Sequence, residues 1–92
     1  MFIPRWYLYV VKCNDGTLYT GITTDIDRRV REHNGMSSSR RGARYTRARR
    51  PVELVWSKEY KNRSEAQKAE YNFKKLFHKE KWEVINEDRS GI

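Results

Sequence analysis

The chain has little of several features that would place it in other classes of protein. Its 92 residues include one cysteine, Cys13, which excludes an intrachain disulfide and a cysteine cluster for zinc. No apolar run approaches the roughly 18 residues that a membrane span needs. The opening residues 1–3 are apolar but are broken at once by Pro4, which is not typical of a secretory signal. These features predict a protein of the reducing cytoplasm.

Acidic residues are scarce relative to basic ones. Lys and Arg number 20 against 12 Asp and Glu, which gives a net charge of +8. An excess of this sign favours a polyanionic partner such as nucleic acid. At 92 residues and 37% hydrophobic content, the chain predicts a single domain, 1–92, with one modest core.

Two segments near the N-terminus predict a β-hairpin. Residues 6–11 and 18–23 are rich in aromatic and β-branched side chains, as strands are. The Asn-Asp-Gly sequence at 14–16 lies between them and is a turn signal.

The length of this turn decides where two tyrosines lie. A two-residue turn would place Tyr9 and Tyr19 on opposite faces of the sheet, whereas a three-residue turn with Gly16 left-handed would pair Tyr9 with Gly21 and place both tyrosines on one face. We favour the three-residue turn because it gathers apolar side chains on the other face. That apolar face consists of Trp6, Leu8, Val10, Leu18 and Ile22.

A short helix is expected directly after the hairpin. Thr24 is its predicted N-cap, with an acid three residues later, and the Asn-Gly sequence at 34–35 is its predicted end. Arg29 and His33 are four residues apart and therefore project from one side of this helix. Two phenols, a guanidinium and an imidazole are thus expected on adjoining elements.

Residues 36–50 show neither a helical nor a strand period, and we interpret them as a long basic loop. Arginine suits bidentate contacts to phosphate, and Tyr45 offers a ring on which a base or ribose could stack. The alternative is a solvated run of charge, but the segment contains no acid, which favours phosphate binding. Its arginines are Arg40, Arg41, Arg44, Arg47, Arg49 and Arg50.

The second half of the chain predicts a third strand and two helices. The strand is expected over 52–57, and a capping box at Ser64 opens a helix to about residue 78. A last helix over 79–87, which closes the core with apolar side chains, precedes a frayed tail at 88–92. The apolar stripe of the first helix is Ala66, Ala69, Phe73, Leu76 and Phe77, and the core residues of the last are Trp82 and Ile85.

The fold class is therefore α+β, with a three-stranded antiparallel sheet flanked by helices in the order β-β-α-β-α-α. Glu70 stands on the apolar stripe of the helix that begins near Ser64. A carboxylate there is costly unless it meets a cation. That cation is either a metal ion or an arginine such as Arg29.

The spacing of the tyrosines, the arginine and the histidine resembles that of the GIY-YIG endonuclease superfamily. Tyr7-Leu8-Tyr9 stands ten residues before Tyr19-Thr20-Gly21, and Arg29 and His33 follow. The resemblance covers nearly the whole chain and is closest to small single-domain members related to the structure-specific junction nucleases. The glycine of the first tripeptide is replaced by Tyr7, and the isoleucine of the second by Thr20, departures that concern packing more than catalysis.

The resemblance implies a DNA endonuclease that hydrolyses phosphodiester bonds in branched or damaged DNA. In such an enzyme Glu70 would hold one Mg²⁺ or Mn²⁺, and Lys74 would be the basic residue that follows it and contacts nucleic acid. Tyr9 would act as general base and Tyr19 would orient the water or the phosphate. We expect Arg29 to lower the pKa of Tyr9 and clamp the scissile phosphate. His33 would relay the proton of Tyr9 or hold Tyr9 by a hydrogen bond.

Two other classes of function stay open at this stage. One is a non-catalytic module on the same fold that binds DNA or RNA, and the other is a structural interaction protein. The complete set of five catalytic positions favours the enzyme. Because the superfamily's larger members attach a recognition domain, a protein partner is a further candidate source of specificity.

Overall fold

The computed structural model describes residues 4–36 and 43–90. The elements follow one another as β-β-α-α-β-α-α, so the predicted α+β class is confirmed, with one additional helix. The strands are β1 (Trp6–Lys12), β2 (Leu18–Thr23) and β3 (Glu53–Tyr60). The helices are α1 (Ile26–His33), α2 (Arg44–Arg47), α3 (Arg63–Lys74) and α4 (His78–Ser90).

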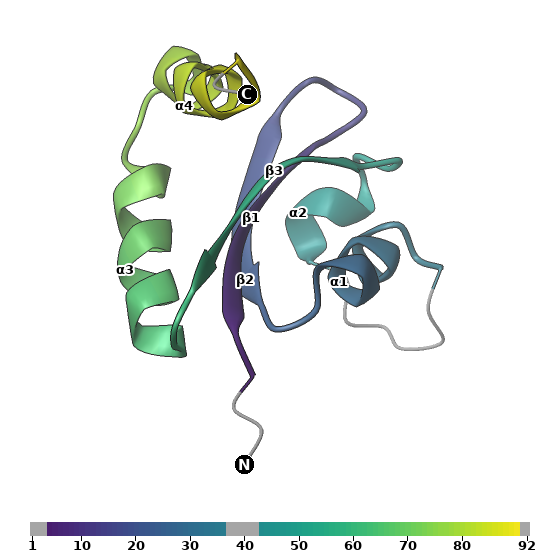
Figure 1. Ribbon diagram of the computed structural model, residues 1–92. Helices are drawn as coiled ribbons and strands as arrows, with labels where there is room; N and C mark the ends of the chain where they lie inside the picture. The colour runs from purple at the N-terminus through teal and green to yellow at the C-terminus, as the bar shows by residue number, and fades with distance from the viewer. Residues whose placement is uncertain (1–3, 37–42, 91–92) are drawn as a thin grey trace.

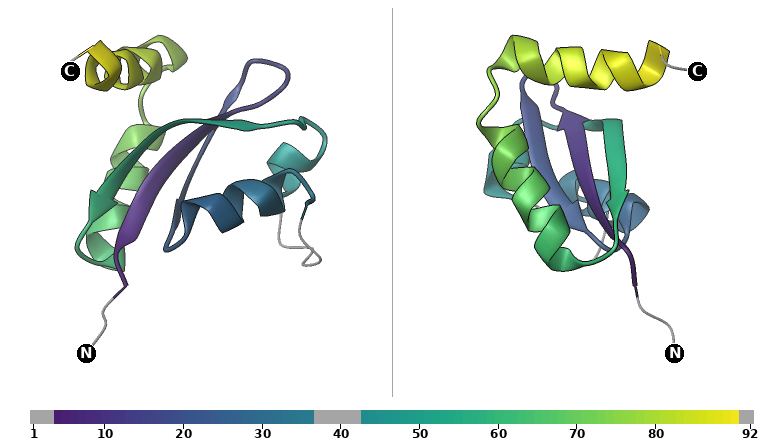
Figure 2. Two further views of the ribbon diagram at one scale, coloured as in Figure 1. Left: turned by 45° about the vertical axis from the view of Figure 1, so that its right-hand side comes forward. Right: turned by 60° about the vertical axis from the view of Figure 1, so that its left-hand side comes forward.

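The sheet is antiparallel in the order β2-β1-β3, so the first strand is central and β2 is an edge. Figure 1 shows α1 and α2 on one side of this sheet and α3 on the other. The last helix, α4, crosses one end of the sheet on the side of α3 (Figure 2). Within the part of the chain that the structure describes, no helix is long and apolar enough to cross a membrane.

The register of the hairpin is the one that a three-residue turn predicts. Tyr9 pairs with Gly21 and Val11 pairs with Tyr19, while Gly16 takes a left-handed φ of 86°. Because side chains alternate along a strand, Tyr9 and Tyr19 lie on the same face of the sheet. This is the face that α1 and α2 cover.

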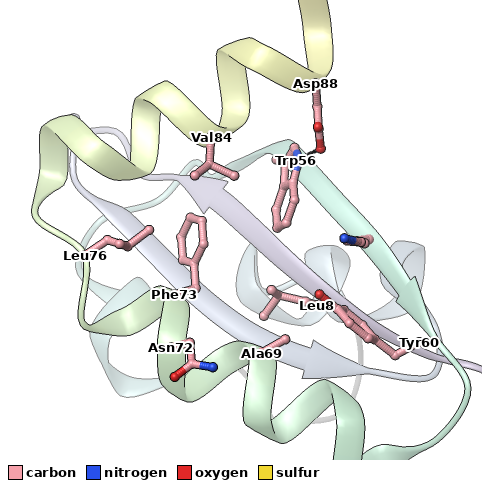
Figure 3. A pocket seen from close by; sticks show the side chains of 10 residues that line it. Leu8, Trp56, Tyr60, Ala69, Asn72, Phe73, Leu76, Val84 and Asp88 are labelled. Carbon is pink, nitrogen blue, oxygen red and sulfur yellow. Dashed lines mark hydrogen bonds between the residues drawn. The ribbon is translucent and has the colours of Figure 1, made fainter. Parts of the chain in front are cut away.

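The opposite face carries the main apolar core. Its buried residues come from β1, β3, α3 and α4, and the Trp56 and Phe73 rings stack with centroids 5.6 Å apart and planes 11° apart. An apolar recess of about 420 Å³ lies beside them, between the sheet and the two helices, and the indole N–H of Trp56 donates to Asp88 at its rim (Figure 3). The buried core residues of this face are Leu8, Val10, Val55, Phe73 and Ile85.

Both predicted helix caps were wrong. The N-cap of α1 is Asp25 rather than Thr24, because its carboxylate accepts from the backbone N–H of Arg28 at 3.1 Å. The N-cap of α3 is Asn62 rather than Ser64, and its side-chain oxygen accepts from the backbone N–H of Glu65 at 2.9 Å. In each case the true cap is a nearby Asx residue whose side chain reaches the N3 amide.

Two helix boundaries also differ from the predicted ones. The third helix ends at Lys74, so Phe77 lies beyond the apolar stripe and is 79% exposed instead of buried. The last helix continues to Ser90, past the start of the expected tail, and residues 91–92 lie outside the described part of the chain. Its predicted core contacts are confirmed: Ile85 is buried, and Trp82 packs against the core.

The segment 36–50 is not wholly the loop that the sequence predicts, because α2 forms within it. A helix of four residues is too short to leave a periodic signal in a sequence. Its middle is anchored instead by a side chain, because Thr46 is completely buried. Residues 37–42, which include two of the six arginines, lie outside the described residues.

Candidate active site

The site is centred on the phenol of Tyr9, which projects from the central strand towards α1 and is 1% exposed. Its hydroxyl lies directly over the backbone of Gly21 on the neighbouring strand. A Cβ atom at Gly21 would lie 2.6 Å from the phenol oxygen, so a side chain there would displace it. The glycine of the second tripeptide is therefore what leaves room for the phenol of the first.

Two residues of α1 contact the phenol oxygen. His33 Nε2 lies 2.7 Å from it, and Arg29 Nε donates to it at 3.3 Å. The two contacts come from one helix face because the residues are one turn apart. The structure thus brings Tyr9, Arg29 and His33 together.

Burial dominates the acid–base properties of this group of residues. It raises the pKa of Tyr9 from 10.0 to about 12, because the lowering effect of Arg29 is smaller. Burial, together with the neighbouring charge of Arg29, lowers the pKa of His33 from 6.5 to about 4. Arg29 therefore lowers the pKa of Tyr9, as expected, but burial outweighs this effect and leaves the pKa above its ordinary value. At neutral pH the phenol is protonated and the imidazole is neutral.

The guanidinium of Arg29 is held by a carboxylate that the sequence did not single out. Arg29 Nη1 donates to Glu32 Oε1 at 2.9 Å, and Glu32 is buried. A buried carboxylate beside a guanidinium is a charge-assisted pair that fixes the orientation of both groups. Arg29 is thereby aimed at Tyr9 rather than left to sample solvent.

The second tyrosine stands next to this group. The ring of Tyr19 lies edge-on to that of His33, with centroids 5.0 Å apart, and is stacked on Tyr45 of α2 at 6.0 Å. A recess of about 210 Å³ opens beside it, and both Tyr45 and Lys74 line this recess with Tyr19. Because Lys74 belongs to α3, the recess joins the two faces of the sheet around the edge strand.

The remaining candidate, Glu70, reaches this edge from α3. Its side chain is 23% exposed and pairs with Lys74 Nζ at 3.2 Å, whereas Arg29 pairs with Glu32. Tyr9 feels its charge, since the raised pKa of the phenol is due first to burial and in smaller part to Glu70. The sequence left two partners open for Glu70, an arginine or a metal ion. The structure shows a third partner, the side chain of Lys74 one turn away.

The donor set at Glu70 suits a hard cation that keeps most of its water. Among the described residues, no group of three or more His, Cys, Asp or Glu side chains gathers to hold a metal ion. One partly exposed carboxylate is nevertheless a typical protein ligand for Mg²⁺, which retains several waters and also binds substrate phosphate. The residues therefore fit a single, mostly hydrated divalent ion.

The chain matches a known family. The family model described as the GIY-YIG catalytic domain matches residues 5–83. This chain belongs to the GIY-YIG family. A GIY-YIG catalytic domain implies a nucleic acid substrate and points to nuclease chemistry, and such domains typically use a divalent cation.

Within this family the GIY-YIG protein described here is similar to small proteins that carry the name UPF0213. It is 52% identical over 89 residues to UPF0213 protein DP2720 of Desulfotalea psychrophila, with 97% of this chain and 78% of that protein covered. It is 45% identical over 85 residues to UPF0213 protein YazA of Bacillus subtilis, with 92% and 82% covered. The solution structure of UPF0213 protein BH0048 from Bacillus halodurans has 38% identity and a TM-score of 0.56, over 89% of this chain and 83% of that one.

The basic segment of this GIY-YIG protein divides into two pairs of arginines within the described residues. Arg49 Nε binds Asp15 Oδ2 at 2.9 Å and its guanidinium lies 3.9 Å from the centre of the Tyr45 ring, while Arg50 Nε donates to the carbonyl of His33 at 2.6 Å. These two arginines therefore make contacts within the fold. Arg44 and Arg47 instead lie exposed on α2. The other two of the predicted set, Arg40 and Arg41, lie outside the described residues.

Sequence reasoning missed one residue that contacts the site from α2. Thr46 Oγ1 lies 2.8 Å from His33 Nδ1, the ring nitrogen that faces away from Tyr9. The two residues are thirteen apart, and the segment between them gave no period. A lone threonine in an arginine-rich stretch carries no signal of such a contact.

Proposed function

We propose that this protein is a DNA endonuclease that hydrolyses phosphodiester bonds in branched or damaged DNA with one divalent cation. The observation that supports this most directly is the phenol of Tyr9, which lies between a guanidinium and a neutral imidazole in a GIY-YIG chain. A buried hydroxyl with a donor on one side and a ring nitrogen on the other is arranged to pass a proton.

In this proposal Tyr9 is the general base, but it does not start as a phenolate. With a pKa of about 12, ionising the resting phenol at pH 7 would cost about 7 kcal/mol. Tyr9 therefore takes a proton from the attacking water while its own proton passes to His33 Nε2. The water oxygen forms its bond to phosphorus as the bond to the leaving oxygen breaks, and the leaving oxygen departs with the electron pair of that bond. Tyr9 ends with the proton of the water in place of its own, and His33 ends with one proton more.

Arg29 and Tyr19 position the phosphate. The guanidinium of Arg29 is oriented by Glu32 and lies beside the base, where it stabilises negative charge that builds on the phosphate oxygens. The hydroxyl of Tyr19, on the same face of the sheet, orients the water or the phosphate. Both side chains are packed in place before substrate arrives, which is what positioning requires.

Glu70 is the residue that would hold the cation, and Lys74 would give up its pairing with Glu70 to contact nucleic acid. When bound, a Mg²⁺ or Mn²⁺ ion supplies positive charge for a non-bridging phosphate oxygen and for the leaving oxygen. The exposed Arg44 and Arg47 would contact phosphates away from the cut, and Arg40 and Arg41 stay predicted contacts of the same kind. A partner protein would add specificity for the DNA structure.

The test is cleavage of flapped, branched, nicked and intact duplex DNA with Mg²⁺ or Mn²⁺. We expect Tyr9→Phe and Glu70→Gln each to abolish cutting while DNA binding persists. The matched controls are Tyr71→Phe, which removes an exposed phenol on α3, and Glu83→Gln, which removes an exposed carboxylate on α4. Both controls should cut like the wild type.

Two outcomes would contradict the proposal. Undiminished cutting by Glu70→Gln would mean that the cation is held elsewhere or that a contaminant cuts. Binding of DNA or RNA without cutting under every metal would favour the alternative function, a non-catalytic nucleic-acid-binding module on the same fold.

A further inference from the structure

A continuous chain of hydrogen bonds crosses the site from α1 to α2. Arg29 Nε donates to Tyr9 at 3.3 Å, Tyr9 lies 2.7 Å from His33 Nε2, and His33 Nδ1 lies 2.8 Å from Thr46 Oγ1. The hydroxyl of Thr46 then lies 3.0 Å from the carbonyl oxygen of Ala43. The three inner residues, Tyr9, His33 and Thr46, are almost fully buried, so their polar atoms must find hydrogen-bond partners within this set.

The two ends of this chain fix the direction of every proton in it. Arginine only donates and a backbone carbonyl only accepts. The single hydroxyl proton of Thr46 is therefore directed at Ala43, which leaves a lone pair of its oxygen facing His33 Nδ1. Nδ1 must then carry the imidazole proton, Nε2 must be bare, and Tyr9 must donate to Nε2.

The reverse assignment leaves two defects in a buried place. If Thr46 donated to His33, its oxygen and the Ala43 carbonyl would lie 3.0 Å apart with no proton between them. The proton on Nε2 would then point at Tyr9, which already accepts from Arg29, and the phenol proton would have no acceptor in the chain. Buried donors without acceptors are rare because they are costly, so only the first assignment satisfies every member.

We propose that Thr46 is a positioning residue for this reaction: it holds His33 in the tautomer protonated on Nδ1, so that Nε2 is free to receive the proton of Tyr9. The inference rests on the proposed function for its catalytic meaning. The tautomer itself follows from the hydrogen bonds alone.

The position of α2 does not depend on Thr46 alone. Arg49 donates to Asp15 of the hairpin turn at 2.9 Å and to the carbonyl of Tyr45 in α2 at 2.8 Å, so it links the helix to the turn. Tyr45 in turn stacks on Tyr19. Removing the Thr46 hydroxyl should therefore change the proton arrangement at His33 without releasing the helix.

The experiment compares Thr46→Val, which keeps the shape and loses the hydroxyl, with Thr46→Ser, which keeps the hydroxyl. The control is Thr20→Val, because Thr20 is also buried, in β2, and its hydroxyl has no hydrogen-bond partner among the described residues. The first readout is the ¹⁵N NMR spectrum of the His33 ring at neutral pH. The second is kcat and KM on flapped DNA.

We expect wild type, Thr46→Ser and Thr20→Val to show a protonated Nδ1 and a bare Nε2, and Thr46→Val to shift towards protonated Nε2. In Thr46→Val, kcat should fall about 100-fold, the low end of what general acid–base catalysis contributes, and KM should not change. The kcat of Thr46→Ser should stay close to that of the wild type. A wild-type ring protonated on Nε2, or a Thr46→Val ring with the wild-type tautomer, would overturn the inference. The expected tautomers with no cleavage by any variant would overturn the proposed function instead, because the NMR readout does not depend on activity.

Discussion

The two faces of the sheet are built from alternate residues of the same strand, yet they serve different ends. Leu8 and Val10 point into an apolar core closed by Phe73 and Ile85. Tyr9, between them in sequence, points the other way into a hydrogen-bonded set of polar groups that is just as completely buried. Buried polar groups add little net stability even when satisfied. The α3 and α4 face therefore stabilises the fold, which allows the α1 and α2 face to hold a polar site away from water.

The largest expected effect tests the stabilising face. Ile85→Ala should lower the free energy of unfolding by about 2–5 kcal/mol, because it leaves a cavity in the apolar core. Tyr9→Phe should cost only about 1–3 kcal/mol, the penalty for leaving His33 without its donor. Urea denaturation measures both, and an equal or larger loss in Tyr9→Phe would contradict the division between the faces.

The next effect tests the polar face through pH. Since the pKa of His33 is about 4 in the folded protein and 6.5 when unfolded, the unfolded state binds more protons between these values. The contribution of His33 to the free energy of unfolding is thus complete above pH 6.5. It is lost as pH falls towards 4, by about 3 kcal/mol in total. The measurement is the free energy of unfolding across this window. His33→Gln should remove this part of the pH dependence, whereas His78→Gln, on the other side of the molecule, should keep it.

A third prediction separates two glycines of the hairpin. Gly21→Ala places a Cβ 2.6 Å from the phenol oxygen of Tyr9, and a displacement of about 1 Å in a catalytic group costs roughly 100-fold in kcat. Gly16→Ala meets no neighbour but has a φ of 86°, so it should lose about 1 kcal/mol of stability and keep its kcat. Steady-state cleavage and urea denaturation of both variants would show whether the effects separate in this way. A wild-type kcat in Gly21→Ala would mean that Tyr9 does not take part in the reaction.

The smallest expected effect concerns the surface of α2. Replacing Arg44 and Arg47 by alanine should flatten the dependence of log affinity for DNA on log salt by about 2, because each phosphate contact contributes about 0.9 to the slope. The matched control replaces Lys68 and Lys79, two exposed lysines of α3 and α4, and removes the same charge. Fluorescence anisotropy over a salt series measures the slopes. The same flattening in the control would mean that only net charge matters.

The sequence carried enough information for the hairpin and for the group around Tyr9, but not for what surrounds them. Only one register gave an apolar face, so the placement of Tyr9 opposite Gly21 followed from pattern alone. The direction of the Tyr9 pKa did not, because it depends on how deeply α1 and α2 bury the phenol. Glu32 reads as an ordinary solvated acid of a helix, and Thr46 lies on a helix too short to show a period. Both gain their roles only through contacts that folding creates.

The helix that carries Glu70 belongs to the stabilising layer, where Phe73 anchors it by stacking on Trp56. A cation at Glu70 and a phosphate beside Tyr19 would consequently bridge the two layers across the edge strand, where Lys74 of α3 pairs with Glu70 and lines a recess with Tyr19. Ligands that bind only the folded form raise its melting temperature. DNA and metal together should thus stabilise the packing of the two layers against each other, and the folded protein should be most stable when both are bound.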